Sequence, residues 1–349
     1  MLHALSTDTD TPVAVKRGRP AKAKAAPVPP PPAEIPAHYA LPSDVAYELT
    51  QLQNLRQLHI KRVALINLPI KALVRRMVGF STFDEKPVRD AAMARYDAVC
   101  KVIDEDSGWD DLSPEDGRIA FMIKPSVDMS CDQIKAINVQ RAETEKKMKV
   151  LAKTLPGADW VENGGTDTKG VGLLGLAVIV GEARADVERY VSPTALINRL
   201  GWGTTPDNLL ANHACSKKRK AEVYSTVLEP MLKQQLTWWE KEGAKKTDVV
   251  KKPAYRYGIV CEHARARYDR LNENGAYAER ALWELNAKTG ATENQKAAWS
   301  KGMLTNDHLF KRAKREALCA FLTDLWMISR GLELRPIEKL LSPIPERIV

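Results

Sequence analysis

Apolar residues recur at steps of three and four from residue 43 onward, a spacing that places them on one face of an α-helix. Ser43 or Asp44 stands where the N-cap of the first helix is expected, and Pro69 is expected to end or kink that helix. The stripe also has the spacing of a coiled-coil seam. Its members are Val45, Leu49, Leu52, Leu55, Leu58, Val63 and Ile66.

Residues 81–130 interrupt this spacing and are expected to form an acidic insertion, because residues 81–120 carry a net charge of −6. The carboxylates of residues 104–116 invite a calcium-loop interpretation, but Trp109 stands where the turn glycine of such a loop belongs. A solvated acidic loop is expected instead. Helical spacing resumes near Ile134, and this second helix either returns antiparallel to the first or pairs across a dimer.

Gly170-Val171-Gly172 predicts the turn of a helix-hairpin-helix. Glycine takes left-handed backbone angles without a steric penalty, and bare backbone N–H groups can approach a phosphate closely. The helix that begins after the turn adds its N-terminal dipole to this attraction. Residues 173–180 are apolar on all sides, so this helix belongs to the core in either case. A tight turn that leads into a buried helix, without phosphate binding, is the alternative.

The rest of the pattern completes an all-α prediction. The last helix is expected to be capped by Asp307 and to end at Gly331, with an exposed basic first half. Trp238 and Trp239 are expected on another helix, as packing residues. The predicted parts are a disordered basic arm (1–42), a long helical hairpin with the acidic insertion (43–152), a helix-hairpin-helix DNA-binding domain (153–335) and a tail (336–349).

The charge distribution favours a polyanionic partner. The 349 residues carry a net charge of +9, of which +1 falls in residues 1–200 and +8 in residues 201–349. Tyrosines interleave with the cations around residues 255–268, which also suits single strands whose bases stack. Solvated helix faces are the plain alternative. The candidate DNA contacts are Lys217, Lys218, Arg219, Lys220, Arg265, Arg267, Lys311, Arg312, Lys314 and Arg315.

Other classes of protein are disfavoured. No run of about 18 apolar residues occurs, so no membrane-spanning helix is expected. Met1 to Pro12 lacks the apolar stretch of a signal peptide, which indicates a cytoplasmic protein. The five cysteines include no Cys-x-x-Cys pair, and His213 with Cys215 supplies too few ligands, so neither a disulfide framework nor a metal site is expected. No cofactor is expected.

The N-terminal arm contains a motif of its own. Arg17, Gly18, Arg19 and Pro20 are flanked by lysines and followed by a proline run, a composition that stays extended. Gly-Arg-Pro among basic residues resembles an AT-hook, whose arginine reaches the floor of a narrow A·T minor groove. A solvated basic tail is the alternative.

Further motifs follow the glycine turn in a fixed order. They are Gly181-Glu182, Arg189-Tyr190-x-Ser192-Pro193-x-Ala195-Leu196, Leu200-Gly201, His263-x-Arg265-x-Arg267-Tyr268 and the segment from Lys311 to Gly331. With Gly170-Val171-Gly172 before them, they resemble the C-terminal DNA-binding domain of DEDD-type insertion-sequence transposases. The resemblance covers residues 145–331 and, more loosely, residues 45–75.

The resemblance implies a helix-hairpin-helix domain that a coiled coil joins to an N-terminal nuclease domain of RNase H-like fold. It also implies a serine nucleophile, whose nearest counterpart is Ser216, although the family's glycines are absent around it. A helix N-cap is the alternative role of Ser216. Residues 1–79 leave no room for a nuclease sheet, so no DEDD metal site is expected, and Mg²⁺ would be a cofactor only of an active nuclease.

These observations predict a DNA-binding protein of transposase type, associated with transposition or recombination and without a nuclease centre of its own. Double-stranded DNA is the expected partner, with structured RNA as a second one. The coiled-coil stripe predicts a homodimer, and the location is expected to be cytoplasmic, at the nucleoid. An active Mg²⁺-dependent recombinase and a helical protein-binding adaptor are the alternative functions.

Overall fold

The computed structural model describes residues 43–203, 216–236, 238–241, 249–252 and 254–346. Helices form nearly all of the regular structure in these ranges, which confirms the predicted all-α class. The expected disordered arm, residues 1–42, lies outside the described residues.

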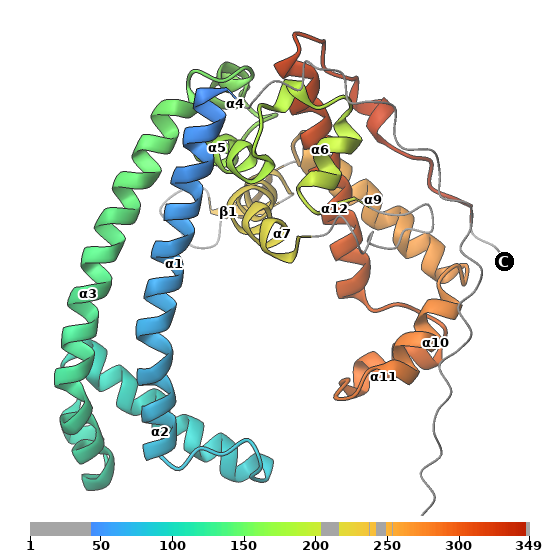
Figure 1. Cartoon of the computed structure of the whole chain (residues 1–349). Helices are drawn as coiled ribbons and strands as arrows, with labels where there is room; N and C mark the ends of the chain where they lie inside the picture. Colours follow the sequence, from blue (N-terminus) through green and yellow to red (C-terminus); the bar gives the residue numbers. More distant parts are fainter. Residues whose placement is uncertain (1–42, 204–215, 237, 242–248, 253, 347–349) are drawn as a thin grey trace, which may run out of the picture. The chain divides into compact units, whose positions relative to one another are not determined.

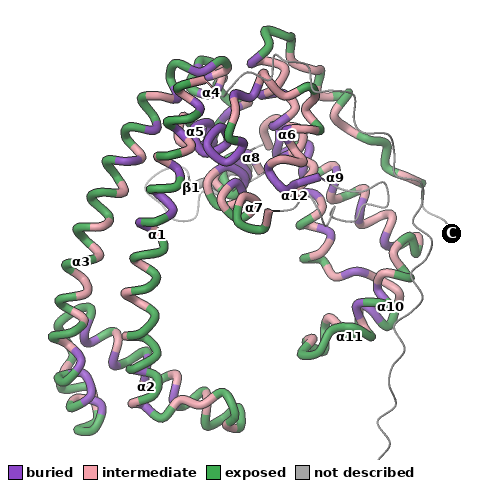
Figure 2. The backbone as a smooth tube through the Cα atoms, in the orientation of Figure 1, coloured by how far each residue is buried: buried purple, intermediate pink, exposed green. Residues whose placement is uncertain are grey.

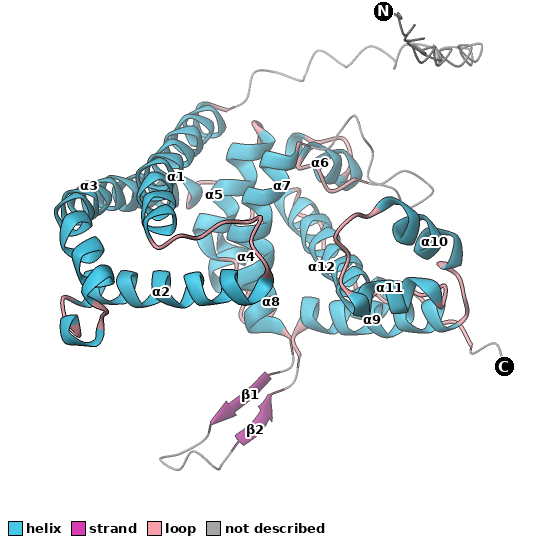
Figure 3. Ribbon diagram, turned by 90° about the horizontal axis from the view of Figure 1, so that it is seen from below, coloured by secondary structure: helices cyan, strands magenta, loops and turns pink. Residues whose placement is uncertain are grey.

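The described residues also contain one two-stranded antiparallel hairpin, β1 (Trp238–Lys241) and β2 (Val249–Lys252), shown in Figure 3. The prediction of a helix at Trp238 and Trp239 is therefore wrong: they pair in register with Lys252 and Lys251. β1 begins with two tryptophans and β2 with two valines, and both residue types favour strands over helices.

Two long helices lie side by side and run in opposite directions, as Figure 1 shows. They are α1 (Asp44–Met77) and α3 (Pro114–Ala152), so the first helix pairs within its own chain. Ser43 caps α1 as predicted, since its side chain accepts a hydrogen bond from the Ala46 N–H. Pro69 does not end α1, because the helix continues for two more turns. After Pro69, Ile70, Val74 and Met77 pack into the core that α1 shares with α2 and α3, and this packing offsets the lost backbone bond.

The expected acidic insertion is largely helical, which corrects the prediction for residues 81–130. Helix α2 (Lys86–Glu105) lies across the far ends of α1 and α3, and α3 already begins at Pro114 rather than near Ile134 (Figure 1). Only a short linker with the 3-10 turn η1 (Trp109–Asp111) separates them. The three helix ends enclose a small core of their own, formed by Val74, Val78, Tyr96, Val99, Ile103, Ile119, Ala120 and Ile123.

The main core surrounds α5 (Gly172–Ala183), whose residues from Gly175 to Ala183 are all buried, as Figure 2 shows. Ala46, Leu49, Met148 and Ala152 of the long helices belong to this same core. The core therefore crosses the boundary expected between residues 152 and 153.

The other helices complete this core around α5. They are α4 (Ala158–Asn163), α6 (Pro193–Arg199), α7 (Lys217–Val223), α8 (Glu229–Gln235), α9 (Arg256–Glu273), α10 (Ala278–Ala287), α11 (Glu293–Ser300) and α12 (Asn306–Ser329). A π-helical turn, η3 (Tyr224–Leu228), joins α7 to α8, and the 3-10 turns η2 (Val187–Arg189) and η4 (Ile337–Leu340) lie in the loops.

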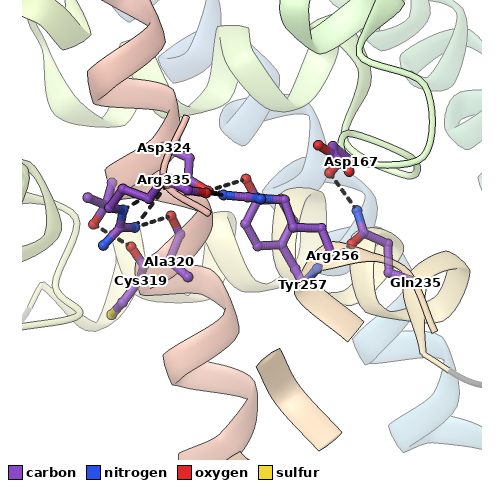
Figure 4. Close-up of polar contacts among 9 residues, drawn as sticks. Asp167, Gln235, Arg256, Tyr257, Cys319, Ala320, Asp324 and Arg335 are labelled. Carbon is purple, nitrogen blue, oxygen red and sulfur yellow. Dashed lines mark hydrogen bonds and ion pairs between the residues drawn. The ribbon is translucent and has the colours of Figure 1, made fainter. Parts of the chain in front are cut away.

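Helices α9 and α12 are held together by a fully buried carboxylate, Asp324 (Figure 4). It accepts hydrogen bonds from Arg256 at 2.9 Å, from Arg335 at 2.9 Å and from the Tyr257 hydroxyl at 3.0 Å. Two guanidinium groups and a hydroxyl offset the cost of burying this charge. Arg335 thereby ties the residues that follow α12 to the core.

The cap of α12 differs from the prediction. Thr305, not Asp307, is the N-cap, and its hydroxyl accepts from the His308 N–H. Asp307 lies in the first turn of the helix, where a carboxylate interacts favourably with the helix dipole. The second half of α12 belongs to the core, since Leu318, Phe321, Leu322 and Leu325 are fully buried.

Candidate nucleic-acid interface

The predicted hairpin turn joins α4 to α5. Gly170 and Gly172 both have positive φ, +92° and +61°, and α5 begins at Gly172. An open depression of about 480 Å³ lies at this helix end. Its lining includes Gly170, Val171, Gly172 and Thr168, with Lys149 of α3 and Lys169 as its cations and Glu162 as its carboxylate.

The two glycines have different roles. A Cβ atom on Gly170 would lie 2.5 Å from the Pro230 carbonyl oxygen and 2.9 Å from the Met231 Cα, so this glycine permits close approach to α8. A Cβ on Gly172 would meet nothing within 4 Å. Gly170 is therefore a packing residue, and Gly172 leaves the start of α5 open toward the depression.

A buried glutamine holds the loop before the turn. Gln235 at the end of α8 donates to the carbonyl oxygens of Asp167 and Lys169, at 3.0 and 3.1 Å. Its own amide oxygen accepts from the Tyr257 N–H at 2.9 Å, and Figure 4 shows its contact with Asp167. The turn is thus fixed to α8 and α9. We did not predict Gln235 as a site residue; the signal is a polar side chain in the apolar spacing of Met231 and Leu232.

The first basic cluster lies on α7, and Arg199 links its N-terminal part to Ala183 at the far end of α5. Lys217 and Lys218 are exposed. Arg219 is half-buried and donates to the Arg199 carbonyl oxygen at 3.5 Å. The Lys220 ammonium lies 4.8 Å from the centre of the Trp202 ring. Two of these four cations therefore project into solvent.

Arg265 and Arg267 of α9 are engaged within the protein. Arg265 forms an ion pair with Asp269 at 2.8 Å and donates to the Asn306 carbonyl oxygen at 2.9 Å. Arg267 forms an ion pair with Glu316 of α12. The two arginines of the His263-x-Arg265-x-Arg267-Tyr268 motif therefore join α9 to α12.

The expectation of an exposed basic first half of α12 is wrong for three of its four cations. The Arg312 guanidinium lies over the rings of Tyr268 and Tyr277, and Lys314 lies over Tyr224 and Phe310. Arg315 donates to the Trp202 carbonyl oxygen at 2.9 Å. Lys311 is exposed and pairs with Asp307 at 2.6 Å. The charged groups of Arg312 and Lys314 thus lie over aromatic rings, a contact that the sequence spacing does not reveal.

Ser216 caps α7, because its hydroxyl oxygen accepts a hydrogen bond from the Arg219 N–H at 3.4 Å. This is the alternative role expected from the sequence. Its neighbours His213 and Cys215 lie outside the described residues, as do Arg17, Gly18, Arg19 and Pro20 of the arm.

Across the part of the chain that the structure describes, no three histidine, cysteine, aspartate or glutamate residues come together as metal ligands. No helix in that part is both long and apolar enough to span a membrane. No family model matches the chain, and no curated protein or solved structure matches it either.

Proposed function

We propose that this chain is a DNA-binding protein of transposase type that contacts the phosphate backbone of a duplex through the turn at the start of α5. Transposition or recombination is the associated process, and the site of action is the nucleoid. The order of the sequence motifs supports the transposase type. The charge distribution supports a polyanionic partner.

Gly172 is the single observation that carries this proposal. It opens a helix of 12 residues, takes a left-handed conformation, and a Cβ atom on it would meet nothing within 4 Å beyond its chain neighbours and its own helix. The first N–H groups of a helix lack partners within the helix and carry a partial positive charge. A phosphate oxygen in the depression would meet these groups together with Lys149 and Lys169.

Contacts of this kind read the backbone and not the bases, so binding is expected to depend weakly on sequence. The AT-hook-like residues Arg17 to Pro20 would add a minor-groove contact. We also propose that the protein acts as a homodimer, in which two such grips raise avidity.

The test compares Gly172→Asn with Gly172→Asp. Both side chains have nearly the same size, both tolerate a left-handed backbone, and a Cβ atom at this position has space. They differ in one negative charge. We expect Gly172→Asn to bind a labelled duplex within about threefold of the unchanged protein, and Gly172→Asp to bind at least about tenfold more weakly, because like charges at about 4 Å near a surface repel by more than 1 kcal/mol.

Fluorescence anisotropy across a salt series measures both affinities, with a structured RNA as competitor. Equal binding of the two variants would overturn the contact at Gly172. Preferential displacement by the RNA would replace duplex DNA as the partner.

A further inference from the structure

Three arginines converge at the opposite end of α5 from the glycine turn. Arg184 follows Ala183, the last residue of α5. The Arg199 guanidinium of α6 donates to the Ala183 carbonyl oxygen at 3.1 Å, and the Arg219 guanidinium of α7 donates to the Arg199 carbonyl oxygen at 3.5 Å. Arg199 also contacts the Tyr190 hydroxyl, and these contacts leave further N–H groups on guanidinium groups that each have five.

The described residues compensate the positive charge of this cluster poorly. None of the three arginines forms an ion pair with a carboxylate in the described part of the chain. Glu182 is the nearby carboxylate, and it accepts hydrogen bonds from Gln53, at 2.8 Å, and from Gln57 of α1. The end of α5 supplies only about half a negative charge, against three guanidinium groups. Burial, and next the charges of Arg199 and Arg184, lower the pKa of Arg219.

Arg184 is also held in an unfavourable conformation. Its φ of +62° is left-handed, and among the described residues Asp106 is the one other non-glycine residue with a positive φ. Glycine or asparagine fits such a helix end without this cost. The fold nevertheless places an exposed arginine here, beside two like charges. Strain of this kind is typical of functional sites.

We infer that Arg184, Arg199 and Arg219 form a phosphate-binding site. A phosphate oxyanion would satisfy the remaining N–H groups and relieve the mutual repulsion of the three charges. The assignment of this phosphate to DNA rests on the proposed function. Gly172 and Arg184 are 12 residues apart, so the two sites lie about 18 Å from each other at 1.5 Å per residue along α5. One duplex could then contact both.

The first experiment uses inorganic phosphate as the probe and needs no DNA. Thermal unfolding of the full chain is followed in about 10 mM phosphate and in chloride of equal ionic strength, so that general salt effects cancel. Arg184→Asn removes the charge and keeps the left-handed backbone; Arg118→Asn, at an exposed position of α3, is the matched control. Ligands that bind the folded state raise its melting temperature.

We expect phosphate to raise the melting temperature of the unchanged protein and of Arg118→Asn, and to raise that of Arg184→Asn clearly less. In chloride, Arg184→Asn is expected to melt above the unchanged protein, because repulsion and strain are both reduced. Arg184→Gly, which relieves the strain fully, is expected to respond to phosphate as Arg184→Asn does. A phosphate response that is the same in all four proteins would overturn the site.

The second experiment assigns the phosphate to DNA. We expect Arg184→Asn to bind a labelled duplex on the order of tenfold more weakly, the effect of one charge-assisted contact. If Arg184→Asn loses the phosphate response but binds DNA normally, the site stands and its assignment to the DNA backbone is overturned. If DNA binding fails for every variant and for the unchanged protein, the proposed function is wrong, and the phosphate response still decides the site.

Discussion

The two glycines of the hairpin turn predict different costs of substitution, although both have positive φ. Gly170→Ala forces a Cβ against the backbone of Pro230 and Met231, so we expect it to lower the free energy of unfolding by about 3 kcal/mol. Gly172→Ala has space and bears only the left-handed penalty, about 1 kcal/mol. Urea unfolding followed by circular dichroism at 222 nm measures both.

Gly170→Ala is therefore unsuited to testing phosphate contact, since its effect on folding comes first. Equal losses for the two variants would show that the chain at Pro230 yields to the added methyl group, and that Gly170 is not a packing residue.

Properties of single residues that depend on neighbours in the chain were predicted correctly from the sequence. The caps at Ser43 and Ser216 and the turn at Gly170 to Gly172 are of this kind. Gln235 was missed, because its partners Asp167 and Lys169 are 68 and 66 residues away in sequence. The sequence also does not show that Arg267 is engaged within the protein, because its ion-pair partner Glu316 is brought close only by tertiary packing.

The junction of α2 with α3 predicts a dependence of stability on pH. Asp116, in the first turn of α3, accepts hydrogen bonds from Arg95 of α2 and from Ser113. The Arg95 bond, more than any other contact, lowers the pKa of Asp116, against the effect of burial. A lowered pKa in the folded state means that this pair stabilises the protein above the unfolded pKa of about 3.9, and that the contribution is lost as the pH falls through the folded pKa.

We expect Asp116→Asn to lower the free energy of unfolding at pH 7 by about 1 kcal/mol, a value reduced for the partial exposure of Arg95. The difference from the unchanged protein should narrow as the pH falls from about 4 to 2.5. Asp132→Asn, which removes an exposed carboxylate from the same helix, should show neither effect. Urea midpoints at each pH measure this, and a constant difference down to pH 2.5 would exclude the pair as its source.

Helices and strands were predicted wrongly where two signals compete in one segment. Helix α2 carries Tyr96, Val99 and Ile103 at helical spacing, but the negative net charge of residues 81–120 suggested an insertion; the predicted acidic loop is confined to the exposed linker between α2 and α3. Charge predicts solvation on average, whereas here Asp116 is buried against Arg95. The hairpin at Trp238 shows the opposite error, because a short apolar run does not distinguish a strand from a helix.

The sequence predicted two long helices but left open whether they pair with each other or with a second copy of the chain. A stripe of apolar residues specifies that a face is covered, and a partner helix from the same chain or from a second copy covers it equally well. Packing around α5 decides the matter for α1 and α3, because Leu49 and Met148 meet in the same core as α5. This common core depends on contacts across more than one hundred residues, which no local pattern encodes.

The placement of lysines on the surface allows a test of whether DNA binding depends on net charge or on a particular surface. Lys217 and Lys218, which were proposed as DNA contacts from the sequence, are exposed on α7 near the end of α5. Lys296 and Lys301, at α11, are also exposed but were not proposed. Replacing either pair by alanine lowers the net charge from +9 to +7. If binding followed net charge alone, the two double variants would behave alike.

We expect the Lys217→Ala, Lys218→Ala variant to reduce the slope of log K against log salt concentration by about 2, since each lost phosphate contact removes about 0.9. The Lys296→Ala, Lys301→Ala variant should keep the slope of the unchanged protein. Anisotropy titrations of one duplex between 50 and 200 mM salt compare the three slopes. If both variants reduce the slope equally, the duplex responds to the overall positive charge of the protein. The surface at α5 and α7 is then not the interface.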